Sequence, residues 1–223
     1  PRSYVCTGES KSVEDFFTET DTAALLVLKD GQRCYERYAL TGGEEVQWMS
    51  WSVAKSFIST LVGIAIGDGL IEDVRDQVVD YIPFLKDSAY DGVTIKDVLQ
   101  MSSGARWVED YSNPDSDVFR LGAAIYGFIG LDDFIKSMQR EFEPGTLCRY
   151  NSADTQVLGT LVREVTGQSI TDYMQEKLCN PLGMTSTGYW LHDKDGMEMA
   201  FGGLNLTARD YAKLGELFRN KGM

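Results

Sequence analysis

The chain has 223 residues, of which 43% are apolar and 25% are charged, a composition that excludes a disordered segment or a coiled coil and predicts a folded core. Its 21 basic and 34 acidic side chains give a net charge of −13, which disfavours nucleic acid and anionic membranes as partners. The best apolar run, Phe57 to Ile66, is shorter than the ~18 residues of a membrane span, and no signal peptide opens the chain, so we expect a cytoplasmic protein.

The first predicted elements are two short strands within residues 23–40. They flank Asp30-Gly31, a pair that favours the tight turn of a β-hairpin. Residues 52–67 are apolar on nearly every face of a helix. This pattern predicts a buried central helix that ends at Asp68-Gly69.

The rest of the chain is predicted to be mainly helical. A short helix is expected over residues 93–99, and the aperiodic segment 105–117 predicts a polar, aromatic loop. One hairpin is marginal by itself, so we expect the remaining strands to lie beyond residue 223 or in a second chain. The longer helices are predicted at 117–128, 131–141, 155–166, 170–178 and 208–220, the last with Thr207 as its N-cap.

Metal and cofactor sites are not expected from the residues present. The single histidine is His192, and the four cysteines (Cys6, Cys34, Cys148 and Cys179) lie far apart without a Cys-x-x-Cys pair. This set excludes most zinc sites and favours cytoplasmic thiols over a disulfide framework. The sequence also lacks the glycine patterns of nucleotide sites.

Ser52 and Lys55 form a Ser-x-x-Lys motif at the start of the predicted central helix. Residues i and i+3 share a helix face, so the Lys55 amine can reach the Ser52 hydroxyl. An apolar setting lowers the pKa of a lysine, and the neutral amine can then take the serine proton. The motif also arises by chance, and Lys55 as a snorkelling side chain is the alternative.

Tyr150 follows the helix-breaking Pro144-Gly145 and precedes another predicted helix. A phenol at that place can carry a proton between a nucleophile and a leaving group. Taken by itself, however, Tyr150 is better explained as a tyrosine that covers the core.

Together these residues resemble a known family. The resemblance is carried by Ser52-x-x-Lys55, Tyr150-x-Ser152, the Pro144-Gly145 pair that precedes Tyr150, and the Ser102-Ser103-Gly104 turn. The sequence looks like the β-lactamase-related serine hydrolases. That family includes class C β-lactamases, D-alanyl-D-alanine carboxypeptidases, esterases and 6-aminohexanoate-dimer hydrolases. The resemblance covers most of the chain, about residues 24–220.

The resemblance implies an α/β fold of the α+β type, similar to β-lactamases and transpeptidases. In that fold an antiparallel sheet is flanked by helices and carries an inserted helical lobe. We therefore expect an incomplete sheet-and-helix region at residues 1–79 with 190–223, and a mainly helical lobe at residues 80–189.

The resemblance also assigns roles to individual residues. It implies Ser52 as the nucleophile, Lys55 as its base and Tyr150 as the proton relay, with the Ser52 N–H as one oxyanion donor. The family's usual Asn is replaced by Ser152, a substrate-binding position with a shorter side chain, so efficient β-lactamase activity is not expected. The family's third motif, a Lys/His-Ser/Thr-Gly strand, has no match, and we expect a fragment or one chain of a cleaved hydrolase.

The loop from Arg106 to Tyr111 is aromatic and acidic, with Asp115 and Asp117 behind it. It looks most like the 6-aminohexanoate-dimer hydrolase and esterase branch, in which a loop tyrosine can close over substrate. Tyr111 is the candidate for that substrate-binding role. In such enzymes acidic groups could also hold a substrate's ammonium. The alternative is a solvated loop that Trp107 fixes to the body of the protein, and for the acidic residues we favour this alternative.

The sequence thus predicts a serine hydrolase that cleaves a small-molecule ester or amide through an acyl-Ser52 intermediate. One alternative is a β-lactamase or a D-alanyl-D-alanine carboxypeptidase. Another is a non-catalytic penicillin-binding-like module or an inactive fragment. A Ser-His-Asp triad is not expected, because His192 lies in a solvated stretch and no Gly-x-Ser-x-Gly turn exists.

Overall fold

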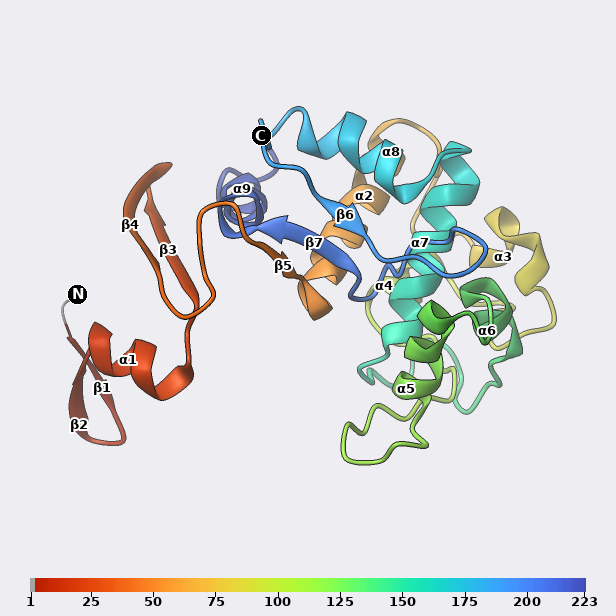
Figure 1. Ribbon diagram of the computed structural model, residues 1–223. Coiled ribbons are helices and arrows are strands. Elements are labelled where there is room, and N and C mark those ends of the chain that lie inside the picture. Colours follow the sequence, from red (N-terminus) through yellow and green to blue (C-terminus); the bar gives the residue numbers. More distant parts are fainter. Residues whose placement is uncertain (1–2) are drawn as a thin grey trace. The chain divides into compact units, whose positions relative to one another are not determined.

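The computed structural model describes residues 3–223, which divide into two compact units (Figure 1). The smaller unit contains the chain up to Trp48 with Met184–Gly188 and Leu206–Met223, and the larger contains Met49–Gly183 and Tyr189–Asn205. The strands form small sheets with the orders β1-β2, β3-β4 and β5-β7-β6. Helices and antiparallel sheets thus occur together, as the predicted fold class requires.

The smaller unit is built around two hairpins. β1 (Ser3–Cys6) pairs with β2 (Glu9–Ser12), which leads into α1 (Val13–Thr20). β3 (Ala24–Lys29) pairs with β4 (Gln32–Tyr38), and Asp30 and Gly31 between them both have positive φ. The predicted hairpin is therefore confirmed. The helix α9 (Ala208–Arg219) packs against β3 and is capped by Thr207, as predicted.

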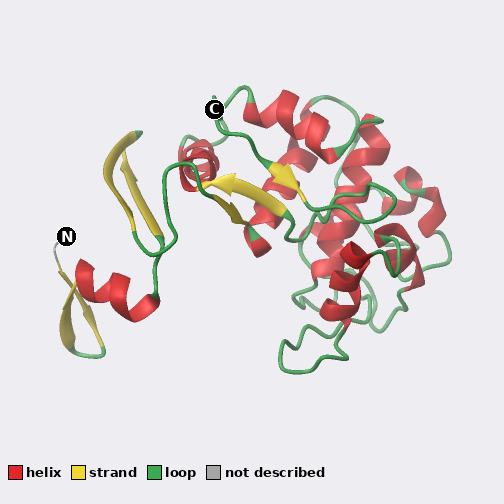
Figure 2. Cartoon of the chain, viewed as in Figure 1, coloured by secondary structure: helices red, strands yellow, loops and turns green. Residues whose placement is uncertain are grey.

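The larger unit is mainly helical (Figure 2). β6 (Tyr189–Trp190) pairs antiparallel with β7 (Leu204–Thr207), and β5 (Gln47–Met49) is the other neighbour of β7. Short 3-10 turns lie at Trp51–Val53, Pro83–Leu85 and Ala123–Tyr126, and a π-turn lies at Gln175–Cys179. The helices are α2 (Ala54–Gly67), α3 (Val78–Tyr81), α4 (Ile95–Leu99), α5 (Asp117–Gly122), α6 (Leu131–Ser137), α7 (Ser152–Thr166) and α8 (Ile170–Met174).

Several predicted helix boundaries differ from the structure: α5 ends at Gly122 and continues as a 3-10 turn, and α8 ends at Met174 and continues as a π-turn. α6 ends at Ser137 rather than near residue 141, because Arg140 forms an antiparallel bridge with Ala105. α7 begins three residues earlier than predicted, at Ser152. The side chain of Asn151 accepts the N–H groups of the first turn and so fixes this start.

The core of the larger unit lies between α2 and α7, which pack side by side (Figure 1). The predicted central helix α2 is buried on one side, which carries Phe57 and Leu61, whereas Ser56 and Gly63 are exposed. α7 is buried more completely, since every residue from Ser152 to Val162 is buried and only its last turn reaches the surface. Because its sequence is rich in polar residues, a hydrophobicity pattern does not predict that this helix is buried.

Buried polar residues of α7 are held by partners from distant segments. Asp154 accepts hydrogen bonds from Tyr90 and Ser103, and the Gln156 amide bonds the backbone of Glu198 and Ala200. These hydrogen bonds offset the cost of removing the polar groups from water. Burial of α7 therefore depends on tertiary contacts.

Cys34, Cys148 and Cys179 are free thiols, while the Cys6 side chain lies outside the described part of the chain. Within residues 3–223 no helix has both the length and the apolar character needed to cross a membrane. The division into residues 1–79 with 190–223 and 80–189 stays a prediction.

Candidate active site

Ser52 lies in the exposed 3-10 turn that precedes α2, within the larger unit. The preceding residue, Trp51, has a φ of 44°, a left-handed conformation that is strained for a bulky side chain. One residue further back, the Ser50 N–H donates to Leu204 O over 2.7 Å and ties this segment to β7. The Ser52 hydroxyl is thereby presented to solvent at the N-terminal, electropositive end of α2.

Lys55 lies one turn after Ser52 and contacts it directly. Its Nζ donates to Ser52 Oγ over 3.1 Å and to the Phe201 carbonyl over 2.9 Å. Burial lowers the pKa of Lys55 to about 8, and the nearby negative charge of Glu109 opposes that shift. A substantial fraction of the amine is therefore neutral near pH 8 and able to accept a proton.

Tyr150 reaches the same serine oxygen from a distant part of the chain. Its Oη donates to Ser52 Oγ over 2.6 Å, and its ring lies 5.2 Å from Lys55 Nζ. Tyr150 directly precedes Asn151, the N-cap of α7, and its side chain is 47% exposed. The structure thus brings together the three residues that the sequence selected as catalytic.

Ser152 and Tyr111 both donate hydrogen bonds to Glu109. The buried Ser152 donates its hydroxyl to Glu109 Oε1 over 3.0 Å and its N–H to Oε2 over 3.2 Å. The Tyr111 phenol donates to Glu109 Oε1 over 2.7 Å, and its side chain is 64% exposed. The indole N–H of Trp107 donates to Oε2 over 2.8 Å.

Glu109 is the residue that sequence reasoning missed, because it was grouped with a solvated acidic loop. It accepts four hydrogen bonds and also acts electrostatically on Lys55. One local signal was present in the sequence: Glu109 lies two residues after Trp107 and two residues before Tyr111, so one hydrogen-bond donor precedes the carboxylate and one follows it. Its partner Ser152 lies 43 residues away, and no local pattern connects them.

Comparison with known proteins gives one consistent result. A family model described as Beta-lactamase matches residues 12–222. The 6-aminohexanoate-dimer hydrolase of Paenarthrobacter ureafaciens is 31% identical over 222 residues, which are 95% of this chain and 55% of that protein. An Escherichia coli K12 protein, provisionally named a D-alanyl-D-alanine carboxypeptidase, is 32% identical over 117 residues, 50% of this chain and 26% of that protein.

Solved structures agree with the sequence relatives. A structure from Bacillus anthracis, provisionally described as a 6-aminohexanoate-dimer hydrolase, superposes with a TM-score of 0.89 at 25% identity. The superposition covers 98% of this chain and 59% of that one. The chain spans about half the length of the hydrolase from Paenarthrobacter ureafaciens and about a quarter of the Escherichia coli protein.

Proposed function

Because the chain belongs to the beta-lactamase family and has a β-lactamase/transpeptidase-like fold, we propose that it is a serine hydrolase that cleaves an ester or an amide through an acyl-Ser52 intermediate. One observation carries the proposal. Ser52 Oγ lies within hydrogen-bond distance of both a lysine amine of lowered pKa and a phenol, at 3.1 Å from Lys55 and 2.6 Å from Tyr150.

In the acylation step Lys55 acts as the base. Its neutral amine takes the proton of the Ser52 hydroxyl, and the resulting oxygen nucleophile attacks the substrate carbonyl carbon. The hydrogen bond from Lys55 Nζ to Phe201 O holds the lysine side chain in a rotamer that places the amine beside Ser52. The Ser52 N–H makes no hydrogen bond within the described part of the chain, and it can donate to the developing oxyanion at the start of α2.

Tyr150 completes the step by donating its phenol proton to the leaving amine or alkoxide, so that the bond to the leaving group breaks. The proton taken up by Lys55 then returns to the tyrosine oxygen, since both groups hydrogen-bond to the same Ser52 Oγ. Water attacks the acyl-serine, the acid leaves, and Ser52 regains its proton. No metal or cofactor takes part in these steps.

The substrate class follows from the residues around Ser52. Trp51 is the sequence neighbour of Ser52 and Tyr150 donates to its hydroxyl, and both are exposed aromatic residues that offer apolar surface beside the serine. We propose that Tyr111 closes over a small linear ester or amide, with Glu109 orienting its phenol. The hydroxyl of Ser152 is already engaged by Glu109, which argues against direct binding of a β-lactam side chain by Ser152.

A covalent probe tests the proposal most directly. The chain is incubated with a fluorophosphonate and its intact mass is measured, with Ser52→Ala and the exposed Ser56→Ala as matched variants. One adduct on the wild type and Ser56→Ala, but none on Ser52→Ala, is the expected result. An unlabelled wild type would favour a non-catalytic module, and labelling of Ser52→Ala would remove Ser52 from the mechanism.

Substrate preference distinguishes the hydrolase from its nearest alternative. We expect turnover of p-nitrophenyl acetate to exceed that of nitrocefin, because Ser152 is buried and hydrogen-bonded to Glu109. A higher rate with nitrocefin would favour a β-lactamase.

A further inference from the structure

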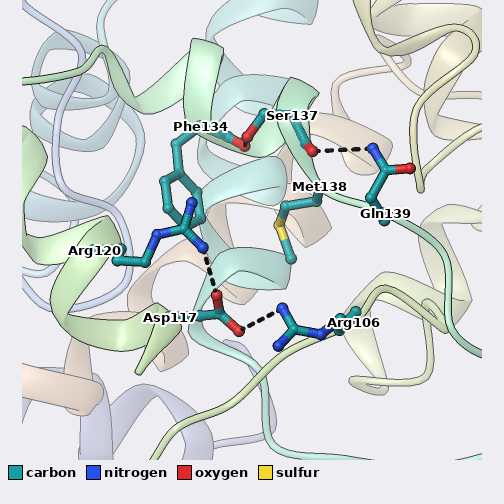
Figure 3. Close-up of a pocket in the computed structure, with 7 residues that line it drawn as sticks. All are labelled: Arg106, Asp117, Arg120, Phe134, Ser137, Met138 and Gln139. Carbon is teal, nitrogen blue, oxygen red and sulfur yellow. Dashed lines mark hydrogen bonds and ion pairs between the residues drawn. The ribbon is translucent and has the colours of Figure 1, made fainter. Parts of the chain in front are cut away.

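A pocket of about 220 Å³ lies in the larger unit, apart from Ser52, Lys55 and Tyr150 (Figure 3). It is formed where the start of α5 faces the end of α6 and the segment that contains Arg106. None of the three proposed catalytic residues lines it. Whatever binds there does so without occupying the serine.

Two arginines and one carboxylate give this pocket its charge. Asp117 is 6% exposed and lies between the two guanidinium groups in Figure 3. Arg120 Nη1 donates to Asp117 Oδ1 over 3.0 Å, and Arg106 Nη1 lies 3.6 Å from Oδ2. Two positive charges therefore face one negative charge, which leaves a local excess of one positive charge in a chain whose net charge is −13.

The arginines retain donors for a further anion. A guanidinium carries five N–H donors in a planar fork. Within residues 3–223, the ion pair with Asp117 at 3.6 Å is the only interaction of the Arg106 guanidinium. The same carboxylate oxygen, Asp117 Oδ2, also accepts the Val108 N–H over 2.9 Å. The side chains of Arg106 and Arg120 are 57% and 60% exposed, so a ligand can approach them from solvent.

The rest of the lining is mixed, with the polar residues Ser137 and Gln139 beside an apolar wall. Phe134 and Met138 are buried and line it, and the guanidinium of Arg120 lies 5.7 Å from the centroid of the Phe134 ring. The volume is about seven times the ~30 Å³ that a water molecule occupies in the liquid. A carboxylate with a short alkyl chain fits both the charge and the size.

We propose that this pocket binds a small carboxylate, with its charged group on Arg106 and Arg120 and its apolar chain against Phe134 and Met138. Arginine recognises carboxylates through paired, charge-assisted hydrogen bonds. The apolar wall adds selectivity for a chain over an inorganic anion, because burial of methylene groups is favourable. The proposal is independent of hydrolysis at Ser52.

Calorimetric titration with hexanoate tests it, and Ser52→Ala protein is used so that turnover does not interfere. We expect saturable binding at one site, with acetate and inorganic phosphate weaker and hexylamine without effect. Addition of Arg106→Gln or Arg120→Gln should weaken hexanoate binding about tenfold, since each removes a charge-assisted hydrogen-bonding group.

Arg75→Gln, added to the same Ser52→Ala protein, is the matched control. Arg75 is also exposed and ion-paired, with Asp73, but it is not part of the pocket. Its loss should leave hexanoate binding unchanged. The proposal is overturned if hexanoate does not saturate up to about 20 mM, if phosphate binds as tightly as hexanoate, or if Arg75→Gln weakens binding as much as Arg106→Gln does.

Discussion

Ser152 gives both its backbone N–H and its hydroxyl to the carboxylate of Glu109, across 43 residues of sequence. The first residue of α7 is thereby joined to the loop that carries Tyr111. Since Tyr150 lies two residues before Ser152, the same carboxylate fixes the surroundings of the proposed proton relay. We infer from these bonds that Glu109 is a positioning residue for the proposed site.

Replacing Glu109 with Ala should reduce stability as well as activity. The variant leaves the buried Ser152 hydroxyl, its N–H and the Trp107 indole without their acceptor. Each unsatisfied buried group costs about 1–3 kcal/mol, so we expect the free energy of unfolding to fall by more than about 2 kcal/mol. Urea denaturation measures it, with the exposed neighbour Asp110→Ala as control. Equal losses for the two variants would contradict the role of Glu109.

The pH dependence of acylation should follow the titration of Lys55. Its pKa of about 8 predicts that the single-turnover rate rises with pH and levels off above that value, because only the neutral amine accepts the serine proton. Glu109→Gln removes a negative charge that raises this pKa, so the rise should move to lower pH. An unchanged midpoint in Glu109→Gln, or a rate that falls through pH 8, would exclude Lys55 as the titrating base.

Asp154 should make stability depend on pH. Burial raises its pKa from about 4 to about 7, while hydrogen bonds from Ser103 and Tyr90 oppose the shift. Between these values the folded state binds more protons than the unfolded state, so the free energy of unfolding falls as pH rises and levels off above about pH 7.

Asp154→Asn isolates this contribution, since the amide oxygen can still accept from Ser103 and Tyr90. We expect the wild type to lose stability relative to Asp154→Asn between pH 4 and pH 8, by an amount of the order of 2–4 kcal/mol. Denaturant titrations of both proteins at each pH give the difference. A difference that stays constant with pH would show that Asp154 ionises normally.

Gly159 and Gly63 provide a matched test of helix packing. A Cβ on Gly159 of α7 would lie 2.4 Å from the Ala200 Cβ, whereas one on Gly63 of α2 meets nothing within 4 Å. Gly159→Ala should therefore destabilise the protein by about 1–3 kcal/mol. Gly63→Ala should stabilise it by up to about 1 kcal/mol, through the helix propensity of alanine. Effects of the same sign would mean that α7 does not pack closely against residue 200.

Several features could be predicted because they depend on neighbours in sequence. The Asp30-Gly31 turn requires two positive φ values, and those residue types supply them. The spacing of Ser52 and Lys55 places the amine within reach of the hydroxyl, and the structure has this contact even though Ser52 precedes α2 in a 3-10 turn. The cap at Thr207 likewise needs only local geometry.

Other features were decided by tertiary structure alone. The polar residues of α7 are buried because Tyr90, Ser103, Glu198 and Ala200 supply hydrogen bonds from elsewhere in the chain. Tyr150 meets Ser52 across 98 residues, and Glu109 gathers donors from two segments. A hydrophobicity pattern indicates which residues favour water. It does not indicate which distant group will replace water as the hydrogen-bond partner of a buried polar side chain. The residue types and their local spacing were therefore determined by the sequence, while the partners that make a buried polar group stable emerged only when the chain folded.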